Sequence, residues 1–501
     1  MSSFSPLFRV SLFSLVLISC AQSQTASPKA SLRTLIISGG PSADYNQYAI
    51  ESNARYVEKL TTGGNQRVLF ANGNRNSRTI STYKEPVIER ELAVLLWILD
   101  EDSPYPSIEM KAPTLKRLDG STAPKTIIRE VESLAKNAKA GERALLYFTG
   151  HGGEGEKKGL FGSKDYDNTN YNGWGGDLSM QSLAPALQKW PANVPLTLVM
   201  VQCHSGGFAN LIWKDGDTKK GIWPRDFCGF FAATGDRMSS GCTSEVDERD
   251  YQDFTTHFFA ALSGVSRDGR PISGADYDRN GAVSGLEAFA YTNLNDHSID
   301  VPMCTSDLYL RRTLGEKDDN GWMQTPYSAI LNEAAPWQKA ILNGLSRELK
   351  LSGDKRIGTV YNALKNFDSD DDESDDDYGY SGLSDDERDE FTRHFYNLKA
   401  DVKRRFPALK SKKSPNNAAS KTKAIAYLKT RPAEVASVYK AYQSYQSDGG
   451  ETSEVREAKL LRFLRTSYTI ALQKRLKEKG TAEQKATFAR LRTSESRNFL
   501  K

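Results

Sequence analysis

Short apolar runs alternate with longer segments whose apolar residues recur every three or four positions, from about residue 33 to residue 262. The runs are typical of buried parallel strands, and the longer segments are typical of helices that cover a sheet. The expected strands are Thr34–Ile37, Arg67–Phe70, Ala144–Phe148, Leu196–Val201 and Gly229–Thr234. The expected helices are Tyr48–Leu60, Glu89–Leu99, Thr126–Ala138, Leu178–Lys189 and Asp253–Leu262. This alternation predicts an α/β fold with a mostly parallel sheet, in which an active site lies at the carboxyl ends of the strands.

The N-terminal segment predicts export from the cytoplasm. Arg9 precedes the apolar stretch Val10–Ile18, which is too short to span a bilayer and is typical of a signal peptide. The stretch ends in Leu-Ile-Ser-Cys20, which resembles the lipobox of bacterial lipoproteins. That resemblance implies that Cys20 is acylated and anchors the protein in the envelope, and Ala21 after it favours the outer membrane. An ordinary cleaved signal, with Cys20 incidental, is the alternative.

Composition divides the rest of the chain. The nearly continuous acid of Asp368–Asp377 cannot bury a core and predicts a solvated linker. Helical periodicity returns after it and predicts a separate all-α region. The expected segments are a signal peptide at 1–19, a tether at 20–31, an α/β domain at 32–312, a helical extension at 313–366, an acidic linker at 367–388 and a basic helical region at 389–501.

Two of the expected strands lead into a histidine and a cysteine. The run Ala144–Phe148 leads into His151-Gly152-Gly153, and the run Leu196–Val201 leads into Gln202-Cys203. A cysteine nucleophile acts as a thiolate, and a nearby histidine takes its proton and later protonates the leaving amine. Glycine lets the backbone approach a substrate, so the amides of Gly152 and Cys203 are candidate donors of an oxyanion hole. The sequence therefore predicts a His151–Cys203 catalytic dyad.

The motifs around the dyad resemble those of the legumain family, cysteine peptidases of clan CD with the caspase-like fold. Tyr147–Gly152 resembles the family's histidine motif, and Cys203-His-Ser-Gly resembles its Cys-x-Ser-Gly motif. Ala233–Cys242 is similar to the segment that forms one wall of the family's specificity pocket. The resemblance covers about residues 33–262 and implies a caspase-like cysteine endopeptidase.

The same resemblance assigns further site residues. It implies that Asn46 orients the histidine and that Ser239, Ser240 and Asp247 line the substrate pocket. Asp236 offers an alternative carboxylate, which would favour a basic substrate residue.

Two departures from the family pattern bear on specificity. Val201 stands where the family has a pocket glutamate, and the region of Tyr48 lacks the family's arginine. The departures argue against the family's preference for asparagine.

The twelve residues from Asp276 to Glu287 match the loop of an EF-hand. Oxygen ligands fall at positions 1, 3, 5 and 12, position 7 offers a carbonyl, and glycine at position 6 permits the sharp turn. The expected ligands of a structural Ca²⁺ are Asp276, Asp278, Asn280, Ala282 and Glu287. The preceding helix is missing, as in dockerin-type repeats, and a turn of Asp and Asn residues that caps a helix is the alternative interpretation.

These features together predict a calcium-stabilised cysteine endopeptidase that is lipid-anchored to the bacterial envelope and hydrolyses peptide or protein substrates. Transpeptidation or ligation through the same acyl-enzyme is one alternative, and a non-enzymatic, calcium-stabilised surface binding protein is another. The three cysteines Cys228, Cys242 and Cys304 allow at most one internal disulfide or remain reduced.

The last part of the chain is strongly basic. Residues 401–501 hold 24 Lys and Arg against 9 Asp and Glu, although the net charge of the chain is only +4. The excess favours a solvated basic face, and an anionic surface as a partner of this region is the alternative. A further hypothesis is that the region docks on the acidic run or on the catalytic cleft and restrains the enzyme.

Overall fold

The computed structural model of the protein describes eight stretches of the chain. They are residues 31–84, 88–101, 107–155, 166–315, 321–367, 384–410, 417–447 and 452–501. The expected signal peptide, Cys20, nearly all of the tether and the acidic run at 368–383 lie outside the described residues. Within the eight stretches, no helix combines the length and the apolar character needed to cross a membrane.

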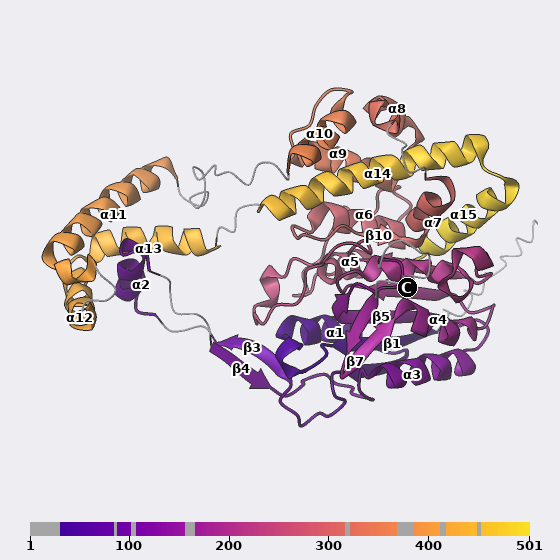
Figure 1. The fold of residues 1–501 in the computed structure, drawn as a ribbon, viewed down its shortest axis with the longest axis horizontal. Helices are drawn as coiled ribbons and strands as arrows, with labels where there is room; N and C mark the ends of the chain where they lie inside the picture. Colours follow the sequence, from indigo (N-terminus) through magenta and orange to yellow (C-terminus); the bar gives the residue numbers. More distant parts are fainter. Residues whose placement is uncertain are drawn as a thin grey trace, which may run out of the picture.

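A mostly parallel sheet forms the centre of the molecule (Figure 1), with the strand order β10-β9-β8-β5-β1-β2. All neighbours on this path are parallel except the edge strand β10, which is antiparallel to β9. The path consists of β1 (Leu32–Gly39), β2 (Asn65–Phe70), β5 (Arg143–Gly153), β8 (Leu196–Met200), β9 (Phe227–Phe231) and β10 (Met303–Cys304). The expected α/β architecture with a mostly parallel sheet is confirmed.

The strands are apolar throughout because both faces of the sheet are covered. Successive side chains point to opposite faces, so Ile36 of β1 joins one core and Leu35 and Ile37 join the other. One face packs on α1 (Tyr48–Leu60) and α5 (Phe254–Ser263), and the other packs on α3 (Pro124–Asn137) and α4 (Met180–Gln188).

Shorter elements extend the sheet domain. The strand β5 continues into an antiparallel pairing with β6 (Asn170–Gly173), which in turn pairs with β7 (Gly176–Ser179). A series of short 3₁₀ helices, labelled η, follows β8 and begins with η2 (Ser205–Ile212). The other short turns are η1 (Ala43–Tyr45), η3 (Lys214–Gly216), η4 (Thr218–Lys220), η5 (Glu248–Asp250), η6 (Gly321–Gln324) and η7 (Pro407–Lys410).

A layer of helices from the second half of the chain covers the α5 side of the sheet (Figure 1). The apolar side chains of Phe463 and Ile470 on α14 belong to the same core as the sheet residues Tyr147 and Phe230. Phe499 packs on Phe230, with ring centroids 6.4 Å apart. The layer consists of α6 (Gly285–Asn295), α8 (Tyr327–Glu333), α9 (Pro336–Glu348), α10 (Arg356–Phe367) and α14 (Ser453–Lys479). Helices α7 (Thr305–Leu314) and α15 (Ala482–Glu495) pack beside β9, and their Leu308, Tyr309 and Leu491 belong to the core on the α3 side.

The remaining helices form a separate cluster, which we call the helical lobe. It consists of α2 (Arg90–Ile98), α11 (Asp385–Arg405), α12 (Asn417–Leu428) and α13 (Pro432–Ser447). The two-stranded sheet of β3 (Ile80–Lys84) and β4 (Ser107–Lys111) carries α2 away from the sheet domain (Figure 1). On α2, Trp97 stacks on Phe391, with ring centroids 5.3 Å apart. The basic helical region expected at 389–501 is therefore divided, because its last two helices bury their apolar side chains in the core of the sheet domain.

Candidate active site

The structure brings His151 and Cys203 to the same edge of the sheet. Their strands β5 and β8 are parallel neighbours, and Phe148 pairs with Met200 in register. Each of the two residues follows its member of that pair by three positions. Because neighbouring strands lie about 4.8 Å apart, the two residues lie at adjacent strand ends on the carboxyl edge of the sheet.

Gly152 lies against the backbone of the nucleophile's own segment. A Cβ atom at this position would lie 2.1 Å from the carbonyl oxygen of Cys203 and 2.6 Å from Cγ of Gln202. Neither contact leaves room for a side chain, so glycine is what allows the two strand ends to approach this closely. The side-chain amide of Gln202 is buried beside Gly152. Neither its nitrogen nor its oxygen has a hydrogen-bond partner in the described part of the chain, and a bound water would satisfy both.

His151 is half-buried and is held by the loop that follows β1. Its Nε2 lies 2.8 Å from Oε1 of Gln47, and the ring of Tyr45 meets the imidazole edge-on at 5.9 Å between centroids. Burial lowers the pKa of His151 below its ordinary value, and a hydrogen bond with the backbone of Tyr45 acts in the opposite direction. The net effect favours the neutral imidazole at neutral pH, which is the form that accepts a proton.

Asn46 does not hold the imidazole. This residue is buried, its Oδ1 accepts the amide of Gly40 at 3.1 Å, and its Nδ2 donates to the carbonyl of Thr79 at 3.0 Å. It therefore fixes the path of the loop, and the neighbouring Gln47 takes the orienting place that was expected for Asn46. Residue type alone did not distinguish these two adjacent amides.

Cys203 is half-buried, and its sulfur faces the loop that follows β9. The amide of Ser239 donates to the sulfur at 3.3 Å, and the thiol donates to the carbonyl of Ser239 at 3.6 Å. Within the described residues the amide of Cys203 itself donates to no other group, so it is available to an incoming oxyanion.

The chain turns sharply directly after Cys203. His204 has a left-handed backbone with φ of 57°, which is unusual for a residue other than glycine. Its amide donates to the carbonyl of Arg237 at 2.8 Å, and its Nδ1 lies 2.8 Å from the carbonyl of Gly235. His204 thus ties the turn to the loop after β9, and its imidazole is turned away from the sulfur.

A pocket of about 420 Å³ lies at residues 239–243, in the loop that contacts the sulfur, and neither Cys203 nor His151 is among its lining residues. Its lining includes Ser239 and Ser240, together with Glu245 and Asp253. Asp253 caps α5 by accepting the amide of Thr256 at 2.7 Å. The helix-start pattern around Asp253 was visible in the sequence, but its place in this pocket was not.

The other two expected pocket residues lie elsewhere. Asp247 is exposed and forms an ion pair with Arg249, whose hydrogen bonds lower the pKa of Asp247 to about 2. Asp236 accepts the hydroxyl of Thr234 and lines a different pocket of about 390 Å³, together with Arg311 and other residues of the C-terminal half. Neither Asp236 nor Asp247 is among the residues that line the pocket at 239–243.

The four described cysteines are all free. Cys242 lies in the same loop as Ser239 and donates to the carbonyl of Gly150 at 3.6 Å. Burial raises its pKa, and the charge of a Cys203 thiolate raises it further. Cys242 is therefore held as a neutral thiol next to the candidate nucleophile.

The acidic loop at 276–287 gathers oxygen atoms around one point. Carboxylate oxygens of Asp276, Asp278 and Glu287 lie within 4.8 Å of one another. Asp276 accepts the amide of Gly281 at 2.9 Å, and Gly281 has φ of +88°, as the sharp turn requires. Among the described residues, no lysine or arginine forms an ion pair with these three carboxylates.

The same loop also starts a helix. Glu287 and Ser284 form a capping box at the beginning of α6. The side-chain oxygen of Asn280 accepts the amide of Ala282 at 2.9 Å, which orders the backbone of the turn. The loop therefore has the geometry of a helix cap and the donor set of an oxygen-ligated cation, and the two roles are compatible.

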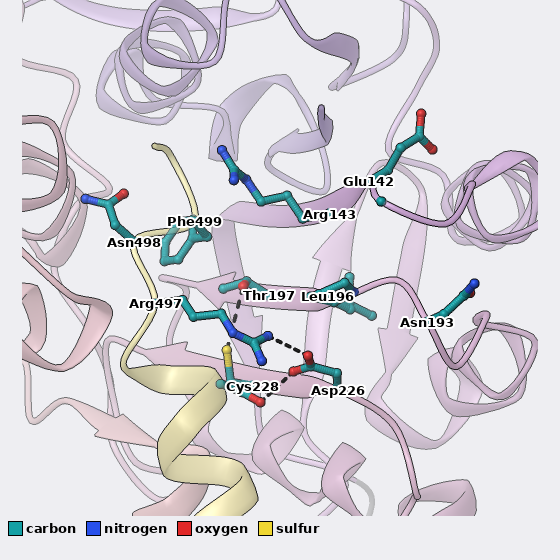
Figure 2. A pocket seen from close by; sticks show the side chains of 13 residues that line it. Glu142, Arg143, Asn193, Leu196, Thr197, Asp226, Cys228, Arg497, Asn498 and Phe499 are labelled. Atoms are coloured by element: carbon teal, nitrogen blue, oxygen red, sulfur yellow. Dashed lines mark hydrogen bonds and ion pairs between the residues drawn. The ribbon is translucent and has the colours of Figure 1, made fainter. Parts of the chain in front are cut away.

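A larger cavity of about 580 Å³ lies at the opposite, amino edge of the sheet (Figure 2). Thr197 and Cys228 line it from the starts of β8 and β9, and Arg497 lines it from the segment after α15. Arg497 forms an ion pair with Asp226 at 2.5 Å. This cavity holds none of the residues that the sequence predicted for catalysis.

Comparisons with known proteins add little to this picture. No protein-family model and no curated protein matches the sequence. Among solved structures, a crystal structure of a Geobacter sulfurreducens protein from a structural-genomics project is 12% identical, covers 55% of this chain and 92% of its own, and superposes with a TM-score of 0.30. A similarity of that size carries no weight for fold or function.

Proposed function

We propose that the protein is a cysteine endopeptidase of the caspase-like type, with Cys203 as nucleophile and His151 as general base and acid. The observation that carries this proposal is the register of β5 and β8, which places the two residues at equivalent positions past a paired Phe148 and Met200. The legumain-like motifs of the sequence agree with the same assignment.

The chemistry follows from the geometry. Neutral His151 takes the proton of the Cys203 thiol when a substrate is bound, and the amide of Ser239 stabilises the thiolate. The sulfur attacks the scissile carbonyl, and the amides of Cys203 and Gly152 receive the developing oxyanion. Donors of this kind are worth about 10²–10³-fold in rate each. Protonated His151 then gives its proton to the leaving amine, and water hydrolyses the thioester.

An active-site probe tests the proposal directly. An acyloxymethyl ketone peptide should label the purified protein at Cys203, and Cys203→Ala should abolish both labelling and cleavage of a peptide library. Cys242→Ala is the matched control, since Cys242 lies beside the site but is held as a neutral thiol. Failure of the wild-type protein to react with probe or peptide would favour a non-enzymatic binding protein.

Product analysis distinguishes hydrolysis from transfer. We expect free carboxyl termini as the main product. Ligated products that form on addition of an amine nucleophile would instead show that the acyl-enzyme serves transpeptidation.

We further propose that the loop at 276–287 binds a structural Ca²⁺. The donors of Asp276, Asp278 and Glu287 are all oxygen and their charge is not balanced by a described cation, which is the chemistry that calcium prefers. The carbonyl of Ala282 and the side chain of Asn280 complete the expected ligand set. Bound calcium would supply charge compensation to the loop, and none of the catalytic steps needs it.

The envelope location stays a proposal that rests on the sequence of the N-terminal segment. Metabolic labelling with palmitate should mark the protein, and Cys20→Ser should abolish the label. A labelled variant would argue for acylation elsewhere, and an unlabelled wild type would argue for an ordinary cleaved signal.

A further inference from the structure

Helix α14 reaches the loop that contacts the Cys203 sulfur. We call residues 234–241 the nucleophile loop. Its Arg237 donates two parallel hydrogen bonds to Glu457 of α14, at 3.0 and 2.7 Å. The backbone carbonyl of the same Arg237 accepts the amide of His204, the residue after the nucleophile. One residue thus links the C-terminal helix to the sharp turn at Cys203.

A second connection runs from α14 through a buried arginine. The Arg462 side chain is 1% exposed and donates to the carbonyls of Asp296, Ser298 and Asp300, at 2.5, 2.9 and 2.7 Å. These carbonyls belong to the segment between α6 and β10. Because a single guanidinium joins three carbonyls of this short segment and also lies 3.9 Å from the Asp296 carboxylate, Arg462 fixes the path of the segment.

The fixed segment reaches the nucleophile loop from its other side. The carboxylate of Asp300 accepts the amide of Ser240 at 2.7 Å and the amide of Phe254 at 3.3 Å. Ser240 follows Ser239, whose amide donates to the Cys203 sulfur. The two connections from α14 therefore end at Arg237 and at Ser240, on either side of Ser239, whose amide contacts the Cys203 sulfur.

The nucleophile loop has little order of its own. It forms no helix or strand, and Gly241 within it has φ of +107°. A loop of this kind takes a single conformation only when outside contacts offset the conformational entropy that ordering costs. Glu457, which lies more than 200 residues later in the sequence, is one of those contacts. Arg462 acts one step further away, through Asp300.

We propose that Glu457 and Arg462 are positioning residues for Cys203, so that helix α14 completes the active site instead of restraining it. This inference rests on the proposed role of Cys203 as nucleophile. It replaces the hypothesis that the basic C-terminal region as a whole is an inhibitor, because α14 is part of the scaffold of the site. The helical lobe, which does not share these contacts, plays no part in it.

A charge exchange in the complete protein tests the first connection. We expect Arg237→Glu and Glu457→Arg each to lower kcat/KM by about 10–100-fold, through kcat more than KM, since a misplaced nucleophile loses rate steeply. The double variant should recover to within about threefold of wild type. Both side chains are 27% exposed and are joined by two hydrogen bonds, so each single variant should lower the melting temperature slightly and the double variant should restore it. Glu454→Arg, on the first turn of the same helix, is the matched control.

A second readout does not depend on peptide cleavage. Alkylation of Cys203 by iodoacetamide as a function of pH should shift to higher pH in each single variant, because the Ser239 amide no longer meets the sulfur, and should return in the double variant. For Arg462, the conservative Arg462→Lys should increase hydrogen exchange at residues 239–241, measured on the folded protein.

The outcomes separate the two proposals. If the wild type cleaves peptides while both single variants keep its rate and its alkylation profile, the positioning role is wrong. Impaired single variants that the double variant does not rescue would also overturn it. If no peptide is cleaved but the alkylation profile shifts and recovers as described, the positioning role stands and the peptidase proposal fails.

Discussion

Cys203 and Cys228 lie at opposite edges of one sheet and differ in the features that govern thiol chemistry. Cys203 follows the carboxyl end of β8, is half-buried and receives the amide of Ser239 at 3.3 Å. Cys228 lies at the start of β9, is buried, and meets the hydroxyl of Thr197 at 3.6 Å (Figure 2). Burial raises the pKa of the Cys228 thiol far above its ordinary value. The two thiols thus differ in exposure and in hydrogen-bond donors because they lie at opposite ends of their strands, and these are the properties that govern thiol reactivity.

The cavities at the two edges of the sheet differ in the same way as the two cysteines. The larger cavity, beside Cys228, is built from the regular starts of strands and the segment after α15. The smaller pocket, beside Cys203, is built from the irregular loop after β9 and from the start of α5. In a parallel sheet the carboxyl edge is where loops gather functional groups, and the volume of a cavity does not indicate chemistry.

Exchanging the two cysteines for alanine gives the largest expected contrast. Cys203→Ala should lower kcat/KM by about 10⁴-fold or more, because no other group at the site can form the acyl intermediate. Cys228→Ala should keep activity within about threefold and lower the free energy of unfolding by about 1 kcal/mol, since it removes one buried sulfur. Peptide cleavage and chemical denaturation measure the two effects. Comparable losses of activity in both variants would mean that Cys203 has no special role.

Among variants at the carboxyl edge of the sheet, substitution of the proposed base should cause the next largest loss of activity. His151→Ala should lower kcat by about 10²–10⁴-fold. In the wild type, burial lowers the pKa of His151 below 6.5, so the neutral base should persist below pH 6.5 and activity should be lost as pH falls through the lowered pKa. The pH profile of kcat/KM measures this limb. His297→Gln, at an exposed histidine, should leave the limb in place, and an acid limb above pH 6.5 would contradict the assignment.

Two adjacent glycines offer a matched test of the close approach of β5 and β8. Gly152→Ala places a methyl group 2.1 Å from the Cys203 carbonyl and should cost about 1–3 kcal/mol of stability and most of the activity. Gly153→Ala meets its nearest atoms at 3.7 Å and should be tolerated. Thermal unfolding and peptide cleavage distinguish them. Equal behaviour of the two variants would show that the strand ends can separate without consequence.

The smallest expected effect on catalysis concerns the loop at 276–287, whose Val283 carbonyl is held by Asn498 at the amino edge. Calcium at 100 times its Kd should add about 2.7 kcal/mol to the free energy of unfolding and raise Tm by roughly 5 °C. Glu287→Gln should remove most of this gain, and Glu245→Gln should not. The pH profile of Cys203 alkylation should be the same with calcium and with EDTA. A Tm that EDTA leaves unchanged would refute the site.

The sheet and the positions of His151 and Cys203 could be predicted because each depends on local sequence. A buried parallel strand is apolar over its length, and the residues that follow it must lie at the carboxyl edge. The roles of Gln47 and Asp253 could not be predicted, since they depend on how loops pack after folding. Asn46 and Gln47 are both amides, and only the direction in which the chain leaves η1 decides which of them meets the imidazole.

The C-terminal half shows the same limit more strongly. Its helices were predictable from periodicity, but their division between the sheet domain and the helical lobe was not. Glu457 and Arg462 contact partners at Arg237 and Asp300 that lie far away in the sequence. Charged residues on a helix ordinarily indicate a face exposed to solvent. Arg462 departs from that pattern: its side chain is only 1% exposed, and four backbone carbonyls supply the hydrogen bonds that its burial requires.

The docking of α2 on the helical lobe bears on the order in which the chain acquires its structure. The apolar side chains of Val94, Leu95 and Ile98 find their partners on helices that begin with α11, long after the central strands of the sheet have been synthesised. Helix α2 therefore leaves the ribosome or translocon with its apolar side chains uncovered, before α11, α12 and α13 are made. We expect α2 to be the segment that chaperones bind in the nascent chain.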